Sequence, residues 1–326
     1  PFASTLDGSE QLRRRPMRRI TGPLRQMGAD ITDTEGRPPL HIRPSPLRGI
    51  HYEMPIASAQ VKSALLLAGL FAEGPTIIIQ PGPARDHTER LLRAMGADVG
   101  MEGNTIMLTP GRRLLPLDLT VPGDFSSAAF LIIAASLLPS SRLTLHNVIL
   151  NPTRIGLLNV LEEMGAAIAV TPTGESGGDP VGRIVVQSTA LGSATVSGEV
   201  VVRMIDEFPL LMVTALFAQG RTEVRDAQEL RVKETDRIAV MAGELRKMGA
   251  IIEERADGFA IVGPQRLQGA AVDAHDDHRI GMSLAIAGLV ADGMTTVQGA
   301  GCIADSFPDF AGTLHALGAN IRERRA

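Results

Sequence analysis

The chain has little aromatic content and almost no cysteine. Of its 326 residues only 3% are aromatic, none is tryptophan, and Cys302 is the single cysteine. One cysteine excludes an intramolecular disulfide and a zinc cluster built from several cysteines. With so few rings, the core has to be built from Leu, Ile, Val, Ala and Met. The scarcity of cysteine fits a reducing compartment, and we expect the cytoplasm.

Long apolar runs and an excess of one charge are also missing. The sequence has no uninterrupted apolar run of about 18 residues and no secretory apolar segment at its start, so it indicates neither a membrane span nor export. The 32 basic and 36 acidic residues are intermixed and give a formal charge of -4. This balance provides no basic surface for nucleic acid. A Walker-type Gly-Lys-Ser/Thr loop and a strand-linked Gly-x-Gly-x-x-Gly turn are absent, so we expect no nucleotide cofactor.

The length and the 44% hydrophobic content predict a sizeable core and two domains. Residues 114–124 contain prolines and a glycine and are the best candidate for a crossover between domains. We therefore expect a first domain over residues 1–117 and a second over 118–326. Residues 171–179 are rich in Thr, Gly and Ser, and they predict a solvated hairpin insertion.

A short pattern returns five times along the chain. Each copy has a leucine, then a methionine or leucine followed by Gly-Ala, and ends on Ile or Val. Such a copy is typical of a helix that ends at a glycine and is followed by a strand. The sequence therefore predicts five repeated α/β units. The copies occupy residues 24–31, 92–99, 161–168, 245–252 and 314–321.

Four segments that are nearly apolar all round precede the last four of these helix ends. A helix without a polar face is buried, so we expect these four inside their domains with strands outside. Polar residues at their starts can cap helices, and gathered helix starts favour an anionic ligand. The segments are 63–72, 126–138, 208–218 and 280–291, with starts at 58–60, 124–127, Asp206 with Glu207, and 276–279.

The first repeat has a closing helix, over residues 17–27, but no apolar helix before it. This asymmetry predicts that the chain begins inside a repeat. We expect an upstream segment that is removed, disordered or supplied as a complementing N-terminal polypeptide. We also expect the chain alone to be incomplete for activity.

The densest group of charges is the stretch Leu-Arg-Val-Lys-Glu-Thr-Asp-Arg at residues 230–237. Apolar residues at helical spacing follow, so these charges are predicted to lie in the first turn of a helix. Lys233 and Arg237 would then share a face and could bind a phosphate or carboxylate, while Glu234 and Asp236 could balance them or move protons. The alternative is an ordinary capped helix end with surface ion pairs.

Eight motifs, in order, resemble those of the 5-enolpyruvylshikimate-3-phosphate (EPSP) synthases, and the similarity covers essentially the whole chain. Two of them, Ala-Ser-Ala-Gln-Val-Lys and Ala-Arg-Asp-His-Thr-Glu, resemble the bacterial subgroup often described as glyphosate-tolerant. The resemblance implies the α/β fold class, as a two-domain inside-out α/β barrel of repeated βαβαββ-like units with about five of six present. The motifs lie at 12–17, 57–63, 85–89, 151–154, 204–209, 230–237, 277–279 and 306–308.

The resemblance implies transfer of the enolpyruvyl group of phosphoenolpyruvate to the 5-hydroxyl of shikimate 3-phosphate, with release of phosphate. This is a step of aromatic amino acid biosynthesis, and it needs no cofactor. Both substrates are anionic small molecules. Bidentate guanidinium groups suit the carboxylate and phosphate of phosphoenolpyruvate better than lysine does.

The resemblance also assigns roles to individual residues. Asp206 matches the acceptor of the 5-hydroxyl proton, and Glu234 matches the residue that moves protons at the methylene carbon. Contacts to phosphoenolpyruvate are matched by Arg15, Gln60, Arg237 and Arg279. Contacts to shikimate 3-phosphate are matched by Ser58, Ala59, Gln60, Arg85, Asp206 and Lys233.

The sequence departs from the family pattern in two places. Asp305 stands where several members have a lysine, which puts a fourth cationic contact to phosphoenolpyruvate in question. The N-terminal lysine and the Gly-rich loop of the family, which bear on glyphosate sensitivity, would lie upstream of Pro1.

Several of these residues also have simpler interpretations. Asp206 could be a helix N-cap, Ser58 and Gln60 could cap the following helix, and Arg279 could pair with Asp276 or Asp277. Residues 275–278 read His-Asp-Asp-His, which is not a zinc spacing, so we favour a polar helix start and expect no metal site.

Two other functions stay open from the sequence. The UDP-N-acetylglucosamine enolpyruvyl transferases share the fold and chemistry, but they typically have a cysteine in the loop before Arg-Pro, and residues 6–12 contain none. The second alternative is a catalytically silent module that binds phosphorylated ligands.

Overall fold

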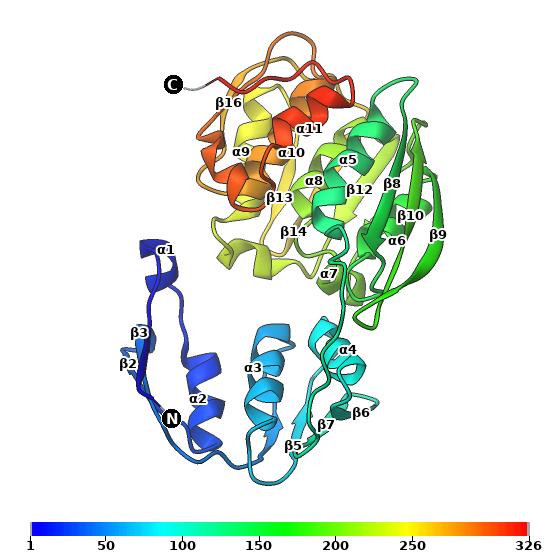
Figure 1. Ribbon diagram of the computed structural model, residues 1–326. Helices are drawn as coiled ribbons and strands as arrows, with labels where there is room; N and C mark the ends of the chain where they lie inside the picture. The colour runs from blue at the N-terminus through cyan, green and yellow to red at the C-terminus, as the bar shows by residue number, and fades with distance from the viewer. Residues whose placement is uncertain (1, 325–326) are drawn as a thin grey trace. The chain divides into compact units, whose positions relative to one another are not determined.

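The computed structural model describes residues 2–324, and their contacts divide the chain into two compact units. Unit 1 extends to Thr120 and includes Glu175–Asp179, whereas unit 2 comprises Val121–Gly174 and the residues from Pro180 onward. The boundary predicted at residue 117 lies inside the connection between β7 (Thr105–Thr109) and α5 (Phe125–Leu137) (Figure 1).

In its described residues, unit 1 contains two small sheets and four helices. The sheets have the strand orders β1-β3-β2 and β4-β5-β7-β6, in which only β4 and β5 pair in parallel. The helices are α1 (Glu10–Arg13), α2 (Arg18–Gln26), α3 (Ala59–Gly69) and α4 (His87–Ala94). The strands are β1 (Ser4–Leu6), β2 (Asp30–Thr34), β3 (Arg37–Arg43), β4 (His51–Glu53), β5 (Thr76–Ile79), β6 (Asp98–Glu102) and β7 (Thr105–Thr109).

Up to residue 324, where the description ends, unit 2 contains three sheets, ordered β8-β10-β9, β11-β12-β14-β13 and β15-β16. Its helices are α5 (Phe125–Leu137), α6 (Gly156–Glu163), α7 (Glu199–Arg203), α8 (Phe208–Phe217), α9 (Arg237–Lys247), α10 (His278–Val290) and α11 (Phe310–Ala316), with 3₁₀ helices η1 (Gln228–Val232) and η2 (Ala300–Asp305). Its strands are β8 (Arg142–Ile149), β9 (Ala167–Ser176), β10 (Asp179–Gln187), β11 (Thr195–Val196), β12 (Gly220–Val224), β13 (Glu253–Arg255), β14 (Gly258–Gly263), β15 (Ala271–Asp273) and β16 (Thr296–Gln298).

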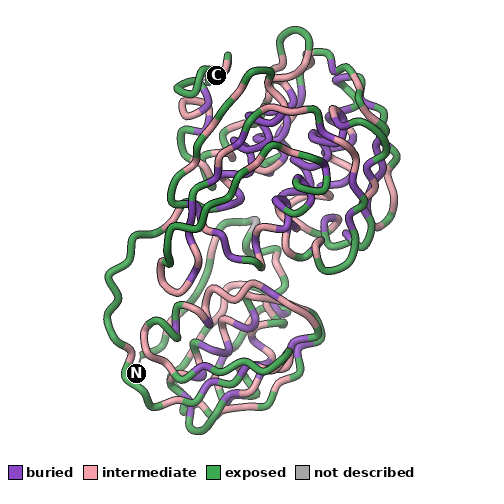
Figure 2. Tube along the Cα trace, turned by 90° about the vertical axis from the view of Figure 1, so that its right-hand side faces the viewer, coloured by how far each residue is buried: buried purple, intermediate pink, exposed green. Residues whose placement is uncertain are grey.

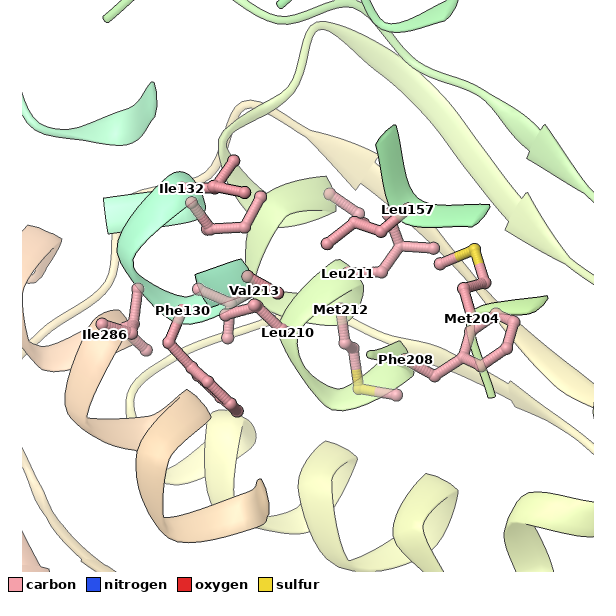
Figure 3. Close-up of a cluster of buried hydrophobic side chains, with 14 of the residues drawn as sticks. Phe130, Ile132, Leu157, Met204, Phe208, Leu210, Leu211, Met212, Val213 and Ile286 are labelled. Atoms are coloured by element: carbon pink, nitrogen blue, oxygen red, sulfur yellow. The ribbon is translucent and has the colours of Figure 1, made fainter. Parts of the chain in front are cut away.

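Three apolar helices form the centre of unit 2. Helices α5, α8 and α10 contact one another, and their sequences lack a polar face, so burial on all sides is the stable arrangement. Figure 3 shows Phe130 and Ile132 of α5 and Leu210 and Val213 of α8 in this core, together with Ile286 of α10. Most residues of these helices are buried, and Figure 2 shows buried segments gathered in the interior with exposed loops around them. The prediction of buried apolar helices is confirmed for these three.

For α3 the prediction of burial on all sides was wrong. Val61, Leu65 and Leu66 lie in the core of unit 1, but Leu67 is 50% exposed. The exposed face of α3 lines a pocket instead, because its small residues Ser63 and Ala64 leave space beside the start of α4.

The five repeated helix ends are confirmed as ends of α2, α4, α6, α9 and α11. The glycine after each has a positive φ, between 77° and 98°, which few other residues adopt without strain. These glycines are Gly28, Gly96, Gly165, Gly249 and Gly318. A strand follows the first four ends. In the residues described after Gly318 no strand follows, so the fifth predicted strand is not found there.

The charged stretch at 230–237 is not a helical turn. η1 ends at Val232, Lys233 has an extended backbone, and α9 begins only at Arg237, because Asp236 is the N-cap and accepts a hydrogen bond from the Ala239 N–H at 3.0 Å. The expectation that Lys233 and Arg237 share one helical face was therefore wrong.

The hairpin predicted at residues 171–179 is confirmed: these residues form the end of β9, the turn at Gly177 and Gly178, and the start of β10, but its tip is not simply solvated. The Asp179 side chain is only 11% exposed, and its carboxylate lies 2.7 Å from Nδ1 of His87 on α4. Arg90 of the same helix donates to the Gly178 carbonyl. These bonds explain why residues 175–179 belong to unit 1.

The helices of the described chain are each too short or too polar to span a membrane.

Candidate active site

The first turns of α5, α8 and α10 converge in unit 2. The Ser126 hydroxyl, at the start of α5, donates a short hydrogen bond to Glu207, the residue that precedes α8. The Arg279 guanidinium, in the first turn of α10, lies 3.4 Å from the carbonyl oxygen of Asp206. Because these three apolar helices pack against one another, their polar starts are brought together at one place.

Asp206 lies at this meeting point, and its carboxylate faces three arginines. Oδ2 is 3.2 Å from Nη1 of Arg154 and 3.6 Å from Nη2 of Arg279, and Oδ1 is 3.5 Å from Nη1 of Arg237. The N-cap interpretation of Asp206 was wrong. Glu207 occupies the cap position and makes no capping bond, since proline near the helix start removes one of the N–H groups that a cap would serve.

Arg237 is held by carboxylates on two other segments. Its Nε lies 2.8 Å from Oδ2 of Asp277, and Nη2 lies 2.7 Å from Oε2 of Glu234. Burial alone would lower the pKa of Arg237, but Asp277, Glu234 and Asp206 together raise it above its ordinary value. The guanidinium is therefore a fixed positive charge in a nearly buried position.

Arg279 does not pair with Asp276 or Asp277 through its side chain, so that simpler interpretation was wrong. Its backbone N–H donates to Oδ1 of Asp277, which caps α10, while its guanidinium extends toward Asp206. Next to it, His278 is half-buried, and this burial lowers the pKa of its imidazole. Asp277 serves as both a helix cap and an anchor for Arg237.

Lys233 lies before α9, where its ammonium is 2.8 Å from Oε1 of Glu229. Glu234 follows with its carboxylate on Arg237. The structure thus brings Asp206, Glu234, Arg237 and Arg279 into one connected group of side chains. Lys233 is near this group in sequence, but it forms its ion pair with Glu229.

Of the predicted contacts to shikimate 3-phosphate in unit 1, Ala59, Gln60 and Arg85 line a pocket of about 460 Å³. Ser58 is the N-cap of α3 and accepts from the Val61 N–H at 3.5 Å, so the capping interpretation is confirmed for it. The hydroxyl of Ser58 also donates to Oε1 of Gln60 at 3.3 Å. The pocket is lined by Ala59, Gln60, Ser63, Ala64, Leu67, Arg85, His87 and Thr88.

A buried ion pair lies beneath this pocket. The Lys62 ammonium is 2.6 Å from Oε1 of Glu89, and both side chains are almost completely buried. Lys62 also donates to the carbonyl of Ala84, the residue before Arg85. Lys62 therefore connects the first turn of α3 with the loop that carries Arg85.

Arg15 and Asp305 are two further positions that the sequence singled out. Arg15 belongs to unit 1, where it follows α1 and its backbone N–H donates to the Leu12 carbonyl at 3.1 Å. Asp305 is the last residue of η2 in unit 2. Cys302 of the same 3₁₀ helix has a thiol pKa raised to about 11, chiefly by burial.

Sequence reasoning missed the partners that hold these side chains. Arg154 was noticed only as part of a motif, and Asp277 only as part of a motif, a polar helix start or a partner of Arg279, although Arg154 contacts Asp206 and Asp277 contacts Arg237. His275, considered as a metal ligand, bonds instead to Glu244 at 2.8 Å. Within residues 2–324, no cluster of three His, Cys, Asp or Glu side chains is arranged to hold a metal ion.

Comparisons with known proteins agree with one another. Residues 1–314 match the model of the family described as EPSP synthase (3-phosphoshikimate 1-carboxyvinyltransferase). The 3-phosphoshikimate 1-carboxyvinyltransferase of Synechococcus sp. is 51% identical over 320 residues, which are 97% of this chain and 72% of that protein. The enzyme of the same name from Desulforudis audaxviator is 48% identical, over 97% of this chain and 74% of its own length.

A solved EPSP synthase structure from Acinetobacter baumannii superposes with a TM-score of 0.91 at 42% identity. The match covers 99% of this chain and 75% of that one. This likeness confirms the predicted EPSP synthase fold class. Because the family model covers nearly all of the chain, and the Synechococcus and Desulforudis relatives exceed 45% identity, the chain belongs to the EPSP synthase family of 3-phosphoshikimate 1-carboxyvinyltransferases.

Proposed function

We propose that Asp206 is the proton acceptor in the transfer of the enolpyruvyl group from phosphoenolpyruvate to the 5-hydroxyl of shikimate 3-phosphate. The observation that carries this role is the position of its carboxylate, only 14% exposed and faced by three arginines where three helix starts meet. A carboxylate fixed in this way can accept a proton at a defined position, and the surrounding cations can hold anionic substrates.

The reaction consists of an addition followed by an elimination. In the addition, the 5-hydroxyl oxygen bonds to C2 of phosphoenolpyruvate, its proton passes to Asp206, and the methylene carbon C3 gains a proton, for which Glu234 is the proposed donor. In the elimination, the C2–O bond to phosphate breaks, and a proton leaves the methyl group to restore the double bond. Glu234 is positioned for such traffic by its 2.7 Å bond to Arg237.

The proposed substrate contacts are distributed over both domains. Arg237 and Arg279 supply guanidinium groups for phosphoenolpyruvate, with Arg15 and Gln60 as further contacts. Shikimate 3-phosphate uses Ala59, Gln60 and Arg85 of the pocket in unit 1 and the neighbouring Ser58, with Lys233 and Asp206. In this proposal residues 1–117 form the shikimate-phosphate side and residues 118–326 carry the catalytic carboxylates.

Three finer assignments remain predictions. The motifs at 57–63 and 85–89 support membership of the glyphosate-tolerant subgroup, and an inhibition curve with glyphosate at fixed phosphoenolpyruvate tests it. The upstream polypeptide and the cytoplasmic location also remain predictions, and neither is needed for the roles assigned to Asp206 and Glu234.

The test of the proposed function is Asp206→Asn in the active enzyme, with phosphate release as the readout. We expect turnover to fall by roughly 100-fold or more while shikimate 3-phosphate still binds, because the lost proton acceptor acts in the transition state. Asp292→Asn, at an exposed position of unit 2, is the matched control and should keep wild-type turnover. Wild-type turnover in Asp206→Asn would remove this residue from the mechanism.

The identity of the substrate that accepts the enolpyruvyl group has its own test. Phosphate release with UDP-N-acetylglucosamine in place of shikimate 3-phosphate should stay at background. Faster release with the nucleotide sugar would show that the alternative enolpyruvyl transferase activity is the correct one.

A further inference from the structure

We propose that Arg154 is a positioning residue that holds the carboxylate of Asp206 for proton transfer. This inference rests on the proposed role of Asp206. The geometry favours it, because the Nη1 of Arg154 is 3.2 Å from Oδ2 of Asp206, which is the shortest of the three arginine contacts to this carboxylate.

Arg154 is anchored independently of Asp206. Its Nη2 donates to the Ser126 hydroxyl at 2.6 Å and lies 3.3 Å from Oδ1 of Asp124, and its side chain is only 7% exposed. Ser126 in turn donates to the buried Glu207. The guanidinium therefore joins the start of α5 to Asp206, and its fork geometry lets one side chain bond in both directions.

The motif Asn-Pro-Thr-Arg at 151–154 explains how the backbone presents this side chain. Asn151 is fully buried, and its Oδ1 accepts from the N–H and the hydroxyl of Thr153 at 2.8 and 2.6 Å. The Arg154 N–H donates to the Asn151 carbonyl at 2.9 Å, closing a turn just before α6. A turn fixed by an Asn side chain and a proline leaves little freedom at the residue that follows it. The motif thus specifies a rigid base for Arg154.

The other two arginines around Asp206 have a different proposed task. Arg237 and Arg279 are assigned to phosphoenolpyruvate, so their contacts to Asp206, at 3.5 and 3.6 Å, can loosen when the substrate binds. Arg154 has no such assignment, and its bonds to Ser126 and Asp124 keep it in place. It can therefore remain beside Asp206 throughout the reaction and fix the direction in which the carboxylate accepts the proton.

Several charged groups of unit 2 contribute to the pH dependence of this site. Arg237 and Arg279 face Asp206 from α9 and α10, Glu207 adjoins it in sequence, and Arg154 is shared with Asp124. Glu234 and Asp277 act on it indirectly, through Arg237. Replacing Arg154 by a neutral residue removes the nearest positive charge, which makes the ionised carboxylate harder to form. The acidic limb of the pH profile should then move to higher pH.

The experiment compares Arg154→Gln, Asp206→Asn and the double variant in the active enzyme, with kcat and KM measured from phosphate release between pH 5 and 9. We expect Arg154→Gln to lower kcat by roughly 10- to 100-fold and to shift the acidic limb of kcat upward by about half a pH unit or more. Binding of shikimate 3-phosphate, followed by calorimetry, should change by less than about threefold. Arg142→Gln, an exposed arginine of β8, is the control and should leave all three readouts unchanged.

The double variant distinguishes an effect of Arg154 that acts through Asp206 from an effect that is independent of Asp206. If Arg154 acts through Asp206, adding Arg154→Gln to Asp206→Asn should cost less than about threefold further. A fully additive loss, or wild-type kcat and pH profile in Arg154→Gln, would overturn the positioning role and leave the role of Asp206 intact. Wild-type kcat in Asp206→Asn would instead overturn the proposed function.

Two milder variants keep the test usable if Arg154→Gln fails to fold. Arg154→Lys keeps the charge but loses the fork, and Ser126→Ala removes one anchor without altering any charge. Both should lower kcat in the same direction by a smaller factor. Wild-type kcat in both would contradict the proposal.

Discussion

Nε of Arg237 lies 2.8 Å from Oδ2 of Asp277, and the two side chains are 2% and 0% exposed. The two residues are 40 positions apart in the sequence. The pair links the start of α9 to the start of α10, and through Arg237 it reaches Glu234 and Asp206 as well. One buried ion pair therefore organises most of the charged side chains of the candidate site.

We predict that Asp277→Asn destabilises the protein by about 3 kcal/mol, because it leaves the buried Arg237 charge without its main partner. The KM for phosphoenolpyruvate should rise, since Arg237 would lose its orientation. Urea unfolding and steady-state kinetics measure the two effects. Asp276→Asn is the matched control: Asp276 is exposed with a φ of 55°, a conformation that Asn tolerates, so stability should change by less than about 0.5 kcal/mol. Equal stability of the two variants would contradict the importance of the pair.

The ion pair of Lys62 and Glu89 allows a similar prediction for unit 1. Lys62→Met should destabilise the protein by about 3–5 kcal/mol, because Glu89 would remain buried without its partner. The double variant Lys62→Met with Glu89→Leu should recover much of this loss, since no unpaired charge remains. Chemical unfolding of both variants checks this. A double variant that is less stable than Lys62→Met alone would show that the charges themselves are required.

The helix ends could be predicted from the sequence because their signals are local. A glycine with a positive φ ends each repeated helix, and apolar composition alone indicated the burial of α5, α8 and α10. The predicted helix began too early, within residues 230–237, because both this charged stretch and the residues from Arg237 onward suit a helix start. The hydrogen bond from the Ala239 N–H to the Asp236 side chain fixes the start of α9 at Arg237, and no pattern of hydrophobicity predicts such a bond.

The site could be predicted only as a set of residues. The motifs indicated Asp206, Glu234, Arg237 and Arg279, but they did not indicate which charges pair. Arg154 and Asp206 are 52 residues apart, and their contact depends on the packing of α5 against α8. The exposure of Leu67 was missed for the same reason, since the neighbours of an apolar helix decide whether each of its faces is covered.

The role of the repeated glycines can be tested within one helix. Gly249 ends α9 with a φ of 91°, and a methyl group added there would meet no atom within 4 Å, so Gly249→Ala should destabilise by about 1 kcal/mol through backbone strain alone. Gly243 lies inside α9 and also has space for a methyl group. Gly243→Ala should therefore stabilise by about 0.5–1 kcal/mol. Thermal unfolding of the two variants should shift in opposite directions, and shifts of the same sign would argue against the strain.

The last prediction concerns Glu207, which is 2% exposed and lies beside Asp206. Burial, aided by the negative charge of Asp206, raises the pKa of Glu207 above its ordinary value of 4.5, although Arg154 and Arg279 oppose the shift. A carboxyl group with a raised pKa holds its proton longer in the folded state than in the unfolded state. Stability should therefore fall as the pH rises from about 4.5 to the folded pKa, and then stay constant as far as this group is concerned.

Glu207→Gln isolates this contribution, because the amide resembles the protonated carboxyl and does not titrate. The free energy of unfolding of the variant, relative to wild type, should increase as the pH rises above about 4.5 and level off once Glu207 is ionised in the folded protein. Urea unfolding at pH 4, 5, 6, 7 and 8 measures this difference. Glu163→Gln, at an exposed position of α6, should show no such trend. A difference for Glu207→Gln that is constant with pH, or that decreases, would mean that the carboxyl is already ionised in the folded protein at pH 4.5, and that the neighbouring arginines outweigh its burial.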